Sequence, residues 1–237
     1  AGILSLIRRV LSCDRAGGWL SPHDVEKLNM TFETFCSSIW RELWAGGKDL
    51  SPDFRARLRT YIYHDTKHWL AKGIMRSTFR PLPDLEALPP PVRPPDTDGA
   101  RMKENQPKLS INVIRGDVLS TACYLKQSFP ELKVGVLSMA CGRHNGGGVG
   151  YGAGAQEENL WRRSTLSVQA EQNPWVLPEV IVYPSVLILR GKEDDGYPFL
   201  PEPTEVVVIS APVQNRPDLV ITTGMEASYA HAGTRAE

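Results

Sequence analysis

The feature that most constrains this chain is a glycine-rich stretch, residues 146–154, with the order Gly-Gly-Gly-Val-Gly-Tyr-Gly-Ala-Gly. An apolar segment precedes it, and a helix-like segment begins at Gln156, Glu157 and Glu158. Glycine lacks a Cβ and tolerates positive φ, so the run lets the backbone approach another group closely. A strand, a glycine loop and a helix start in this order predict a phosphate cradle of backbone N–H groups. The two glutamates cannot bind phosphate themselves, so they need another role.

The spacing argues against two common phosphate-binding motifs. A P-loop carries Lys-Ser or Lys-Thr after its last glycine, whereas Ala155 follows Gly154 here. The dinucleotide fingerprint is matched only in its looser form, by Gly148, Gly150 and Ala153, and this run does not pass directly from a strand into a helix. The stretch therefore predicts anion binding in another structural context.

The composition is that of an ordinary globular protein. The 237 residues have a formal net charge of zero, so no whole-protein field draws the chain to a membrane or to nucleic acid, and we expect neither membrane nor sequence-specific nucleic-acid partners. Residues 1–11 are too short for a membrane span and contain Arg8 and Arg9, so no export signal is predicted. The four cysteines lack CxxC spacing, which favours reduced thiols and a cytoplasmic or nuclear location.

Residues 1–80 are predicted to form an N-terminal helical region. Ser21 and Pro22 are typical of an N-cap and a first helical residue. The aromatic stripe that follows is interpreted as core rather than as a ligand site. His64 and His68 have helical spacing but no obvious third ligand, so we predict neither a metal nor a cofactor.

The composition changes over residues 81–107, which are rich in proline and are expected to form a linker or a surface loop. Beyond them, segments that favour strands alternate with segments that favour helices. This alternation predicts an α/β domain over residues 108–237, with ligands at the C-terminal ends of strands. The expected strands are 109–114, 134–139, 180–189 and 205–210, and the expected helices are 119–128 and 159–170.

The spacing of three glycines, seven residues and Gln-Glu-Glu over residues 146–158 resembles the signature of the microbial-type poly(ADP-ribose) glycohydrolase branch of the macrodomain superfamily. Residues 159–166 also look like that subfamily's helix, and a weaker resemblance extends over 109–215. It implies a macrodomain-like three-layer α/β/α fold with a mixed sheet. It further implies hydrolysis of ADP-ribosyl O-glycosidic bonds, with ADP-ribose or poly(ADP-ribose), including polymer on modified proteins, as partner.

The same resemblance implies that Glu158 is the general acid and that Glu157 holds a ribose hydroxyl beside it. The residues that it assigns to substrate binding are Gly146, Gly147, Gly148, Gln156 and Asp117. The glycines would wrap the diphosphate, the glutamine would help to fix the loop, and the aspartate would receive the adenine amino group. The chemistry agrees, because the leaving oxygen of a ribosyl bond needs a proton. Consecutive glutamates on a helix point about 100° apart, so one of them can face the bond while the other holds a hydroxyl.

Each assignment has a plainer alternative. Acids in a first helical turn complement the helix dipole, and Glu158 could pair with Arg162 at i, i+4. Asp117 follows a glycine, which is ordinary turn chemistry. His144 and Cys141 are more simply structural neighbours of the loop.

The chain departs from the family's pattern at two places. Ser138-Met139-Ala140 stands where relatives carry Asn-Phe-Ala, which puts a substrate-contacting asparagine in doubt. Nothing after Asn215 resembles the family's second phosphate loop, so the domain is expected to be incomplete at its C-terminus. Two alternatives to hydrolysis therefore stay open: a weak or inactive ADP-ribose-binding module, and a protein-interaction fragment that uses the N-terminal helices and the proline-rich segment.

Overall fold

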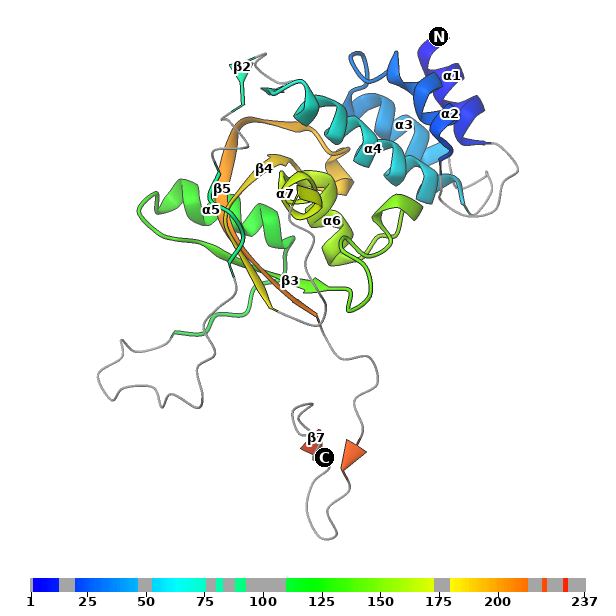
Figure 1. The fold of residues 1–237 in the computed structure, drawn as a ribbon. Helices are drawn as coiled ribbons and strands as arrows, with labels where there is room; N and C mark the ends of the chain where they lie inside the picture. Colours follow the sequence, from blue (N-terminus) through cyan, green and yellow to red (C-terminus); the bar gives the residue numbers. More distant parts are fainter. Residues whose placement is uncertain are drawn as a thin grey trace, which may run out of the picture.

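The computed structural model of the chain describes residues 2–12, 20–46, 53–75, 80–82, 88–92, 110–172, 180–212, 219–220 and 228–229. Within these ranges, no helix combines the length and the apolar character that crossing a bilayer requires. Figure 1 shows the N-terminal helices gathered beside the end of a twisted sheet.

The N-terminal helices of the described part are α1 (Gly2–Leu11), α2 (Pro22–Asn29), α3 (Ser37–Gly46) and α4 (Phe54–Ala71). The expected start of α2 is confirmed as a capping box. The Ser21 side chain accepts a hydrogen bond from the Asp24 amide, and the Asp24 carboxylate accepts one from the Ser21 amide. The aromatic stripe is indeed core, since Phe32 and Phe35 are buried with their ring centroids 5.1 and 4.7 Å from that of Tyr61 on α4.

The central sheet consists of β3 (Gly135–Ala140), β4 (Ile181–Arg190) and β5 (Phe199–Pro212) in the order β3-β5-β4. Strand β5 pairs parallel to β3 and antiparallel to β4, so the predicted mixed sheet and α/β class are confirmed. The register of β4 shifts between Tyr183 and Val186, because Pro184 cannot donate to the ladder. The short strand pairs are β1 (Ile74–Met75) with β2 (Arg80–Pro81), and β6 (Leu219–Val220) with β7 (Ser228–Tyr229).

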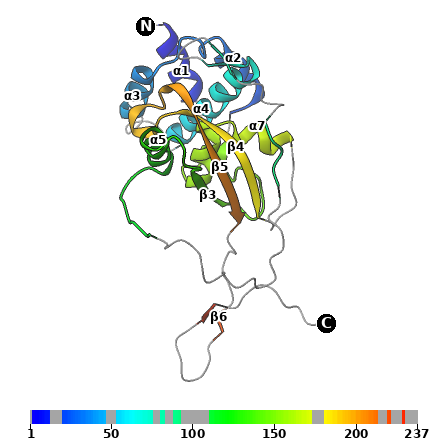
Figure 2. The ribbon, with the colours of Figure 1, turned by 90° about the vertical axis from the view of Figure 1, so that its left-hand side faces the viewer.

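The helices around the sheet are α5 (Val118–Ser128), α6 (Gln156–Arg163) and α7 (Leu166–Gln172), with single 3₁₀ turns η1 (Val149–Tyr151) and η2 (Glu193–Asp195). Figure 2 shows the three strands between α5 and α7. The single helix expected over 159–170 is divided into α6 and α7. The break occurs because Ser164 bridges to Ile188, and the Thr165 amide donates to the Leu187 carbonyl at 3.0 Å, along β4.

One face of the sheet carries most of its burial. Val136, Val206 and Val208 lie in one buried cluster with Leu160 and Trp161 of α6. The opposite face is more open, since the described residues leave Leu137, Met139 and Ile209 exposed. The alternation follows from the period-two geometry of a strand.

The strand predicted over residues 109–114 is wrong for its described part. Residues 110–115 adopt no regular structure, and the Val113 side chain is 97% exposed. An extended segment becomes a strand only when a neighbour takes up its backbone hydrogen bonds, and no strand of the described residues does so here.

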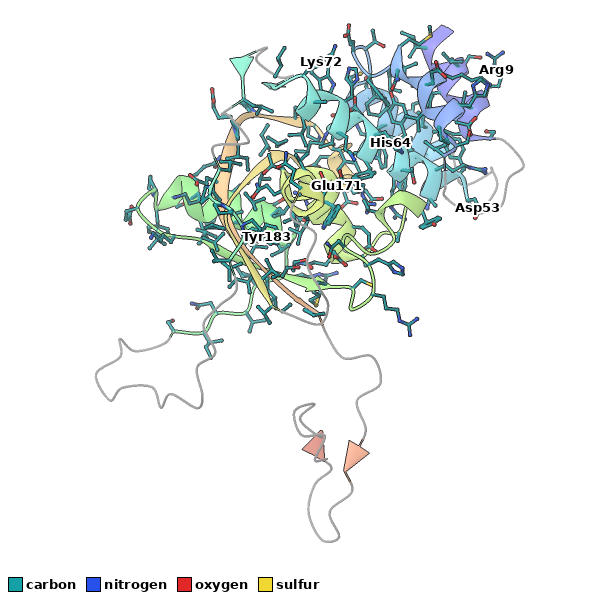
Figure 3. The ribbon with its side chains drawn as sticks, viewed as in Figure 1. Arg9, Asp53, His64, Lys72, Glu171 and Tyr183 are labelled. Atoms are coloured by element: carbon teal, nitrogen blue, oxygen red, sulfur yellow. The ribbon has the colours of Figure 1, made fainter. Side chains whose placement is uncertain are left out.

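Helix α4 connects the N-terminal helices to the α/β part. It contacts η1, α6 and α7, and its Tyr63 and Lys67 side chains bind Glu171 of α7 at 2.8 and 2.7 Å. Figure 3 shows Glu171 beside the helix that carries His64. The domain limits predicted at 80 and 107 stay predictions, because most of the proline-rich segment lies outside the described residues. So does the chain beyond 212, apart from β6 and β7.

Candidate active site

The glycine-rich loop leaves the C-terminal end of β3 and enters α6, where it lies directly against the two glutamates. Gly147 has φ +54°, and a Cβ added there would lie 2.5 Å from Oε1 of Glu158 and 3.0 Å from Oε2 of Glu157. Both the backbone conformation and the space therefore require glycine at this position.

Glu157 binds both ends of the turn between β3 and the triple glycine. Its Oε1 accepts from the Gly146 amide at 2.9 Å, and its Oε2 accepts from the Cys141 amide at 2.7 Å. Burial raises the pKa of Glu157, the two N–H groups oppose that rise, and the charge of Glu158 adds to it. Because both of its carboxylate oxygens accept hydrogen bonds from backbone amides, Glu157 fixes the conformation of the loop.

Glu158 engages only one of its two carboxylate oxygens. Oε1 accepts from the Gly148 amide at 2.8 Å, whereas Oε2 is buried and has no hydrogen-bond partner among the described residues. The alternative role for Glu158 was an ion pair with Arg162. The Nη2 atom of Arg162 instead donates to the Ala153 carbonyl at 2.6 Å. A buried carboxylate oxygen without a partner is costly, and such groups occur where a ligand or a proton is received.

Three amides of the triple glycine donate within the protein. Gly146 and Gly148 donate to the two glutamates, and Gly147 donates to the His144 carbonyl at 3.1 Å. The first turn of α6 offers another source of donors, because its N-cap, Ala155, makes no side-chain cap hydrogen bond. An anion approaching this end of α6 would meet amide groups and the positive end of the helix dipole.

Gln156 connects the start of α6 to the edge of β3. Its Nε2 donates to the Leu137 carbonyl at 2.6 Å, and its Oε1 accepts from the Met139 amide at 2.9 Å. The side-chain amide thus takes the place of a neighbouring strand's backbone and sets the distance between β3 and α6.

Asp117 lies at the other end of α6, paired with Arg163. Its two oxygens accept from the Arg163 guanidinium at 2.8 and 2.9 Å, and Oδ1 also caps α5 by accepting from the Ser120 amide at 2.8 Å. Burial alone would raise the pKa of Asp117, but the Arg163 hydrogen bonds and charge, with Ser120, lower it to about 2.

This pair predicts a specific pH dependence of stability. The pKa of Asp117 is lower in the folded chain than its ordinary value of 3.8, so its stabilisation is present above that value and is lost as pH falls towards 2. Asp117→Asn should lower the free energy of unfolding by about 2 kcal/mol at neutral pH. Urea unfolding at a series of pH values measures it. The difference between the two proteins should shrink between pH 4 and 2, and a difference that does not change with pH would contradict the assignment.

The structure thus places the predicted site residues in two groups. The triple glycine, Glu157 and Glu158 are joined by direct hydrogen bonds, whereas Asp117 belongs to the α5–α6 contact. The role of Arg163 was missed, since a pair 46 residues apart leaves no local pattern. Two further buried atoms near the loop, Ser138 Oγ and Asn145 Oδ1, have no hydrogen-bond partner in the described part of the chain.

The described residues contain no group of three or more side chains suited to a metal ion. His68 packs its ring against Phe32, with centroids 5.2 Å apart. Burial lowers the pKa of His64, with a contribution from the charge of Lys67, to about 4.

Comparison with protein families gives one match over residues 64–176, to the family described as "Microbial-type PARG, catalytic domain". The match covers the glycine-rich loop, both glutamates and Asp117, and it confirms the resemblance found in the sequence. No match was found among curated proteins.

Solved structures of bacterial poly(ADP-ribose) glycohydrolases also match. The enzyme from Thermomonospora curvata is 24% identical with a TM-score of 0.49, covering 65% of this chain and 63% of that one. Its complex with the inhibitor ADP-HPD is 25% identical with the same TM-score, covering 65% and 62%. The enzyme from Deinococcus radiodurans in complex with ADP-ribose is 27% identical with a TM-score of 0.33, covering 40% and 41%. This chain therefore spans less than two thirds of these relatives.

Proposed function

We propose that this chain hydrolyses ADP-ribosyl O-glycosidic bonds, because residues 64–176 match the microbial-type PARG catalytic-domain family. The substrates are poly(ADP-ribose) or ADP-ribosylated macromolecules, including modified proteins. The proposal rests above all on one observation: Glu158 has a buried carboxylate oxygen, Oε2, that no described residue binds.

In this proposal Glu158 is the general acid. Protonated at Oε2, it gives its proton to the leaving oxygen as the bond between that oxygen and the ribosyl C1 breaks. Water then adds its oxygen to C1 and returns a proton to the carboxylate, so the products are ADP-ribose and an alcohol. The hydrogen bond from the Gly148 amide to Oε1 fixes the carboxylate, which keeps Oε2 aimed at one place.

Glu157 serves the reaction by shaping the site. Because its oxygens bind the Gly146 and Cys141 amides, it holds the loop beside Glu158, and we propose that its carboxylate edge also meets a ribose hydroxyl. The diphosphate follows the glycine loop, where missing side chains let its oxygens approach the backbone. The uncapped first turn of α6 adds amides and a positive partial charge.

Asp117 is the proposed adenine-binding residue of the site. It would receive the adenine amino group through Oδ2, which among the described residues accepts a hydrogen bond from Arg163 and retains a lone pair. Its tight pair with Arg163 supports a fixed acceptor at one end of α6.

A binding module without turnover is the second candidate. It is favoured by Ser138, whose buried hydroxyl makes no hydrogen bond to a described residue and which stands where the family carries a longer amide side chain. In this case the loop holds ADP-ribose, but the ribose is not oriented for cleavage.

One paired experiment separates the candidates. Poly(ADP-ribose) is incubated with the chain, free ADP-ribose is followed by chromatography, and ADP-ribose binding is measured by calorimetry. Release together with binding supports the hydrolase, and binding without release supports the module. No binding and no release would reject both and leave the interaction fragment.

A further inference from the structure

The far end of the glycine-rich loop rests on a part of α4 that lies outside the family match. Gly152 has φ +73°, and a Cβ added there would lie 1.8 Å from the Ala56 carbonyl oxygen, so two backbones touch directly. The Thr60 hydroxyl also donates to the Gly150 carbonyl at 3.4 Å. Residues 150–154 therefore pack directly against α4.

Arg59 of α4 covers the end of this loop. A Cβ added to Gly154 would lie 2.8 Å from the central carbon of the Arg59 guanidinium. The guanidinium is held from two sides: its Nε donates to Oε1 of Glu193 at 2.9 Å, and its central carbon lies 5.1 Å from the centre of the Trp44 ring. An arginine with a carboxylate and an aromatic face as partners keeps a defined position.

Glu193 carries the connection onward to α6. Its Oε2 lies 3.0 Å from the Tyr197 hydroxyl, which is 3.3 Å from Oδ1 of Asn159, the residue after Glu158. Burial raises the pKa of Tyr197 to about 12, so the phenol stays neutral and keeps its proton for hydrogen bonding. Its backbone φ of +50° is unusual for a residue with a Cβ, which marks a position that the surrounding structure imposes.

The loop end is also held from α6. The fully buried Arg162 donates from Nη2 to the Ala153 carbonyl at 2.6 Å. Ala153 thus accepts a hydrogen bond from an arginine of α6, and the guanidinium of an arginine of α4 lies against Gly154. The side chains of Arg59 and Glu193 are 24% and 16% exposed, so water screens their ion pair only in part.

We infer that Arg59 and Glu193 are positioning residues for the glycine loop. They fix the position of Ala153 and Gly154 relative to α4. Through the Tyr197 hydroxyl, Glu193 also connects this position to α6, the helix that carries Glu158. The N-terminal helices are then part of the substrate site. Loop anchoring stands on the contacts alone, whereas its effect on ADP-ribose rests on the proposed function.

Hydrogen–deuterium exchange of the full chain tests the anchoring without any ligand. Arg59→Ala and Glu193→Gln should each speed amide exchange in residues 150–154 by about fivefold or more, since releasing a partly buried pair shifts local opening by that order. Arg59→Lys keeps the charge facing Glu193 but loses the guanidinium plane over Trp44, so it should restore only part of the protection. Lys67→Ala is the matched control, because it removes an α4 ion pair with Glu171 that does not touch the loop.

The same variants test the consequence for the site. If the loop binds the diphosphate equally in ground and transition states, loosening it raises KM about fivefold to tenfold and leaves kcat within about twofold. A merely structural role would reduce the amount of folded protein without this split.

The outcomes are distinct. Unchanged exchange in residues 150–154 for both Arg59→Ala and Glu193→Gln overturns the inference, as does equal acceleration in Lys67→Ala. Faster loop exchange in a chain whose unaltered form neither binds nor cleaves ADP-ribose compounds supports the anchoring and rejects the proposed function.

Discussion

Glu158→Gln is expected to lower the rate of ADP-ribose release by about 10²–10⁴-fold, the usual contribution of a general acid. Glutamine keeps the size of the side chain, and its oxygen can still accept a hydrogen bond from the Gly148 amide, so the loop should keep its conformation. What is lost is the proton at the position of Oε2. Initial rates on poly(ADP-ribose) measure the effect, and calorimetry should show ADP-ribose affinity within about threefold of the unaltered chain.

A matched change elsewhere separates chemistry from general damage. Glu131 is an exposed glutamate in the turn between α5 and β3, remote in sequence from the loop, and Glu131→Gln should leave the rate unchanged. If Glu158→Gln retains most of the activity, or loses activity only in proportion to lost binding, Glu158 is not the acid.

Asp65→Ala should produce the largest loss of stability, about 3–5 kcal/mol in the free energy of unfolding. Asp65 of α4 pairs with Arg190 at the end of β4, and the two side chains are 0% and 1% exposed. Arg190 also donates to the Tyr197 carbonyl at 3.1 Å and lies over the Phe199 ring. Removing the aspartate leaves the buried Arg190 guanidinium without its carboxylate partner where the N-terminal helices meet the sheet.

Urea unfolding measures this loss, and the exposed pair on the same helix is the control. Lys67 and Glu171 are 37% and 42% exposed, so Lys67→Ala should cost no more than about 1 kcal/mol. Similar losses for the two variants would mean that the buried pair does not join the two parts of the chain.

The core of the site could be predicted from sequence because its parts are contiguous. The triple glycine and the two glutamates lie within thirteen residues, and the hydrogen bonds among them follow from one loop turning back on one helix start. The strands β3, β4 and β5 were also predictable, because each contains a buried apolar run. Strand β4 forms even though it contains Pro184.

What sequence could not give depends on contacts between distant segments. The pairing of Asp117 with Arg163, and its role as N-cap of α5, join segments that are separate in the sequence. The break between α6 and α7 arises because the edge of β4 takes up backbone groups that a continuous helix would have used. The support of Gly152 by Ala56 joins residues 96 positions apart, for which no pattern exists within either segment.

In the proposed reaction the bond that breaks is the glycosidic bond at the ribosyl C1. The most direct test of this step is to digest poly(ADP-ribose) in water enriched in ¹⁸O and to analyse the products by mass spectrometry. The proposed mechanism predicts free ADP-ribose carrying ¹⁸O on C1, with none in the hydroxyl of the leaving chain. Products ending in a labelled phosphate, or label in the leaving hydroxyl, would contradict it.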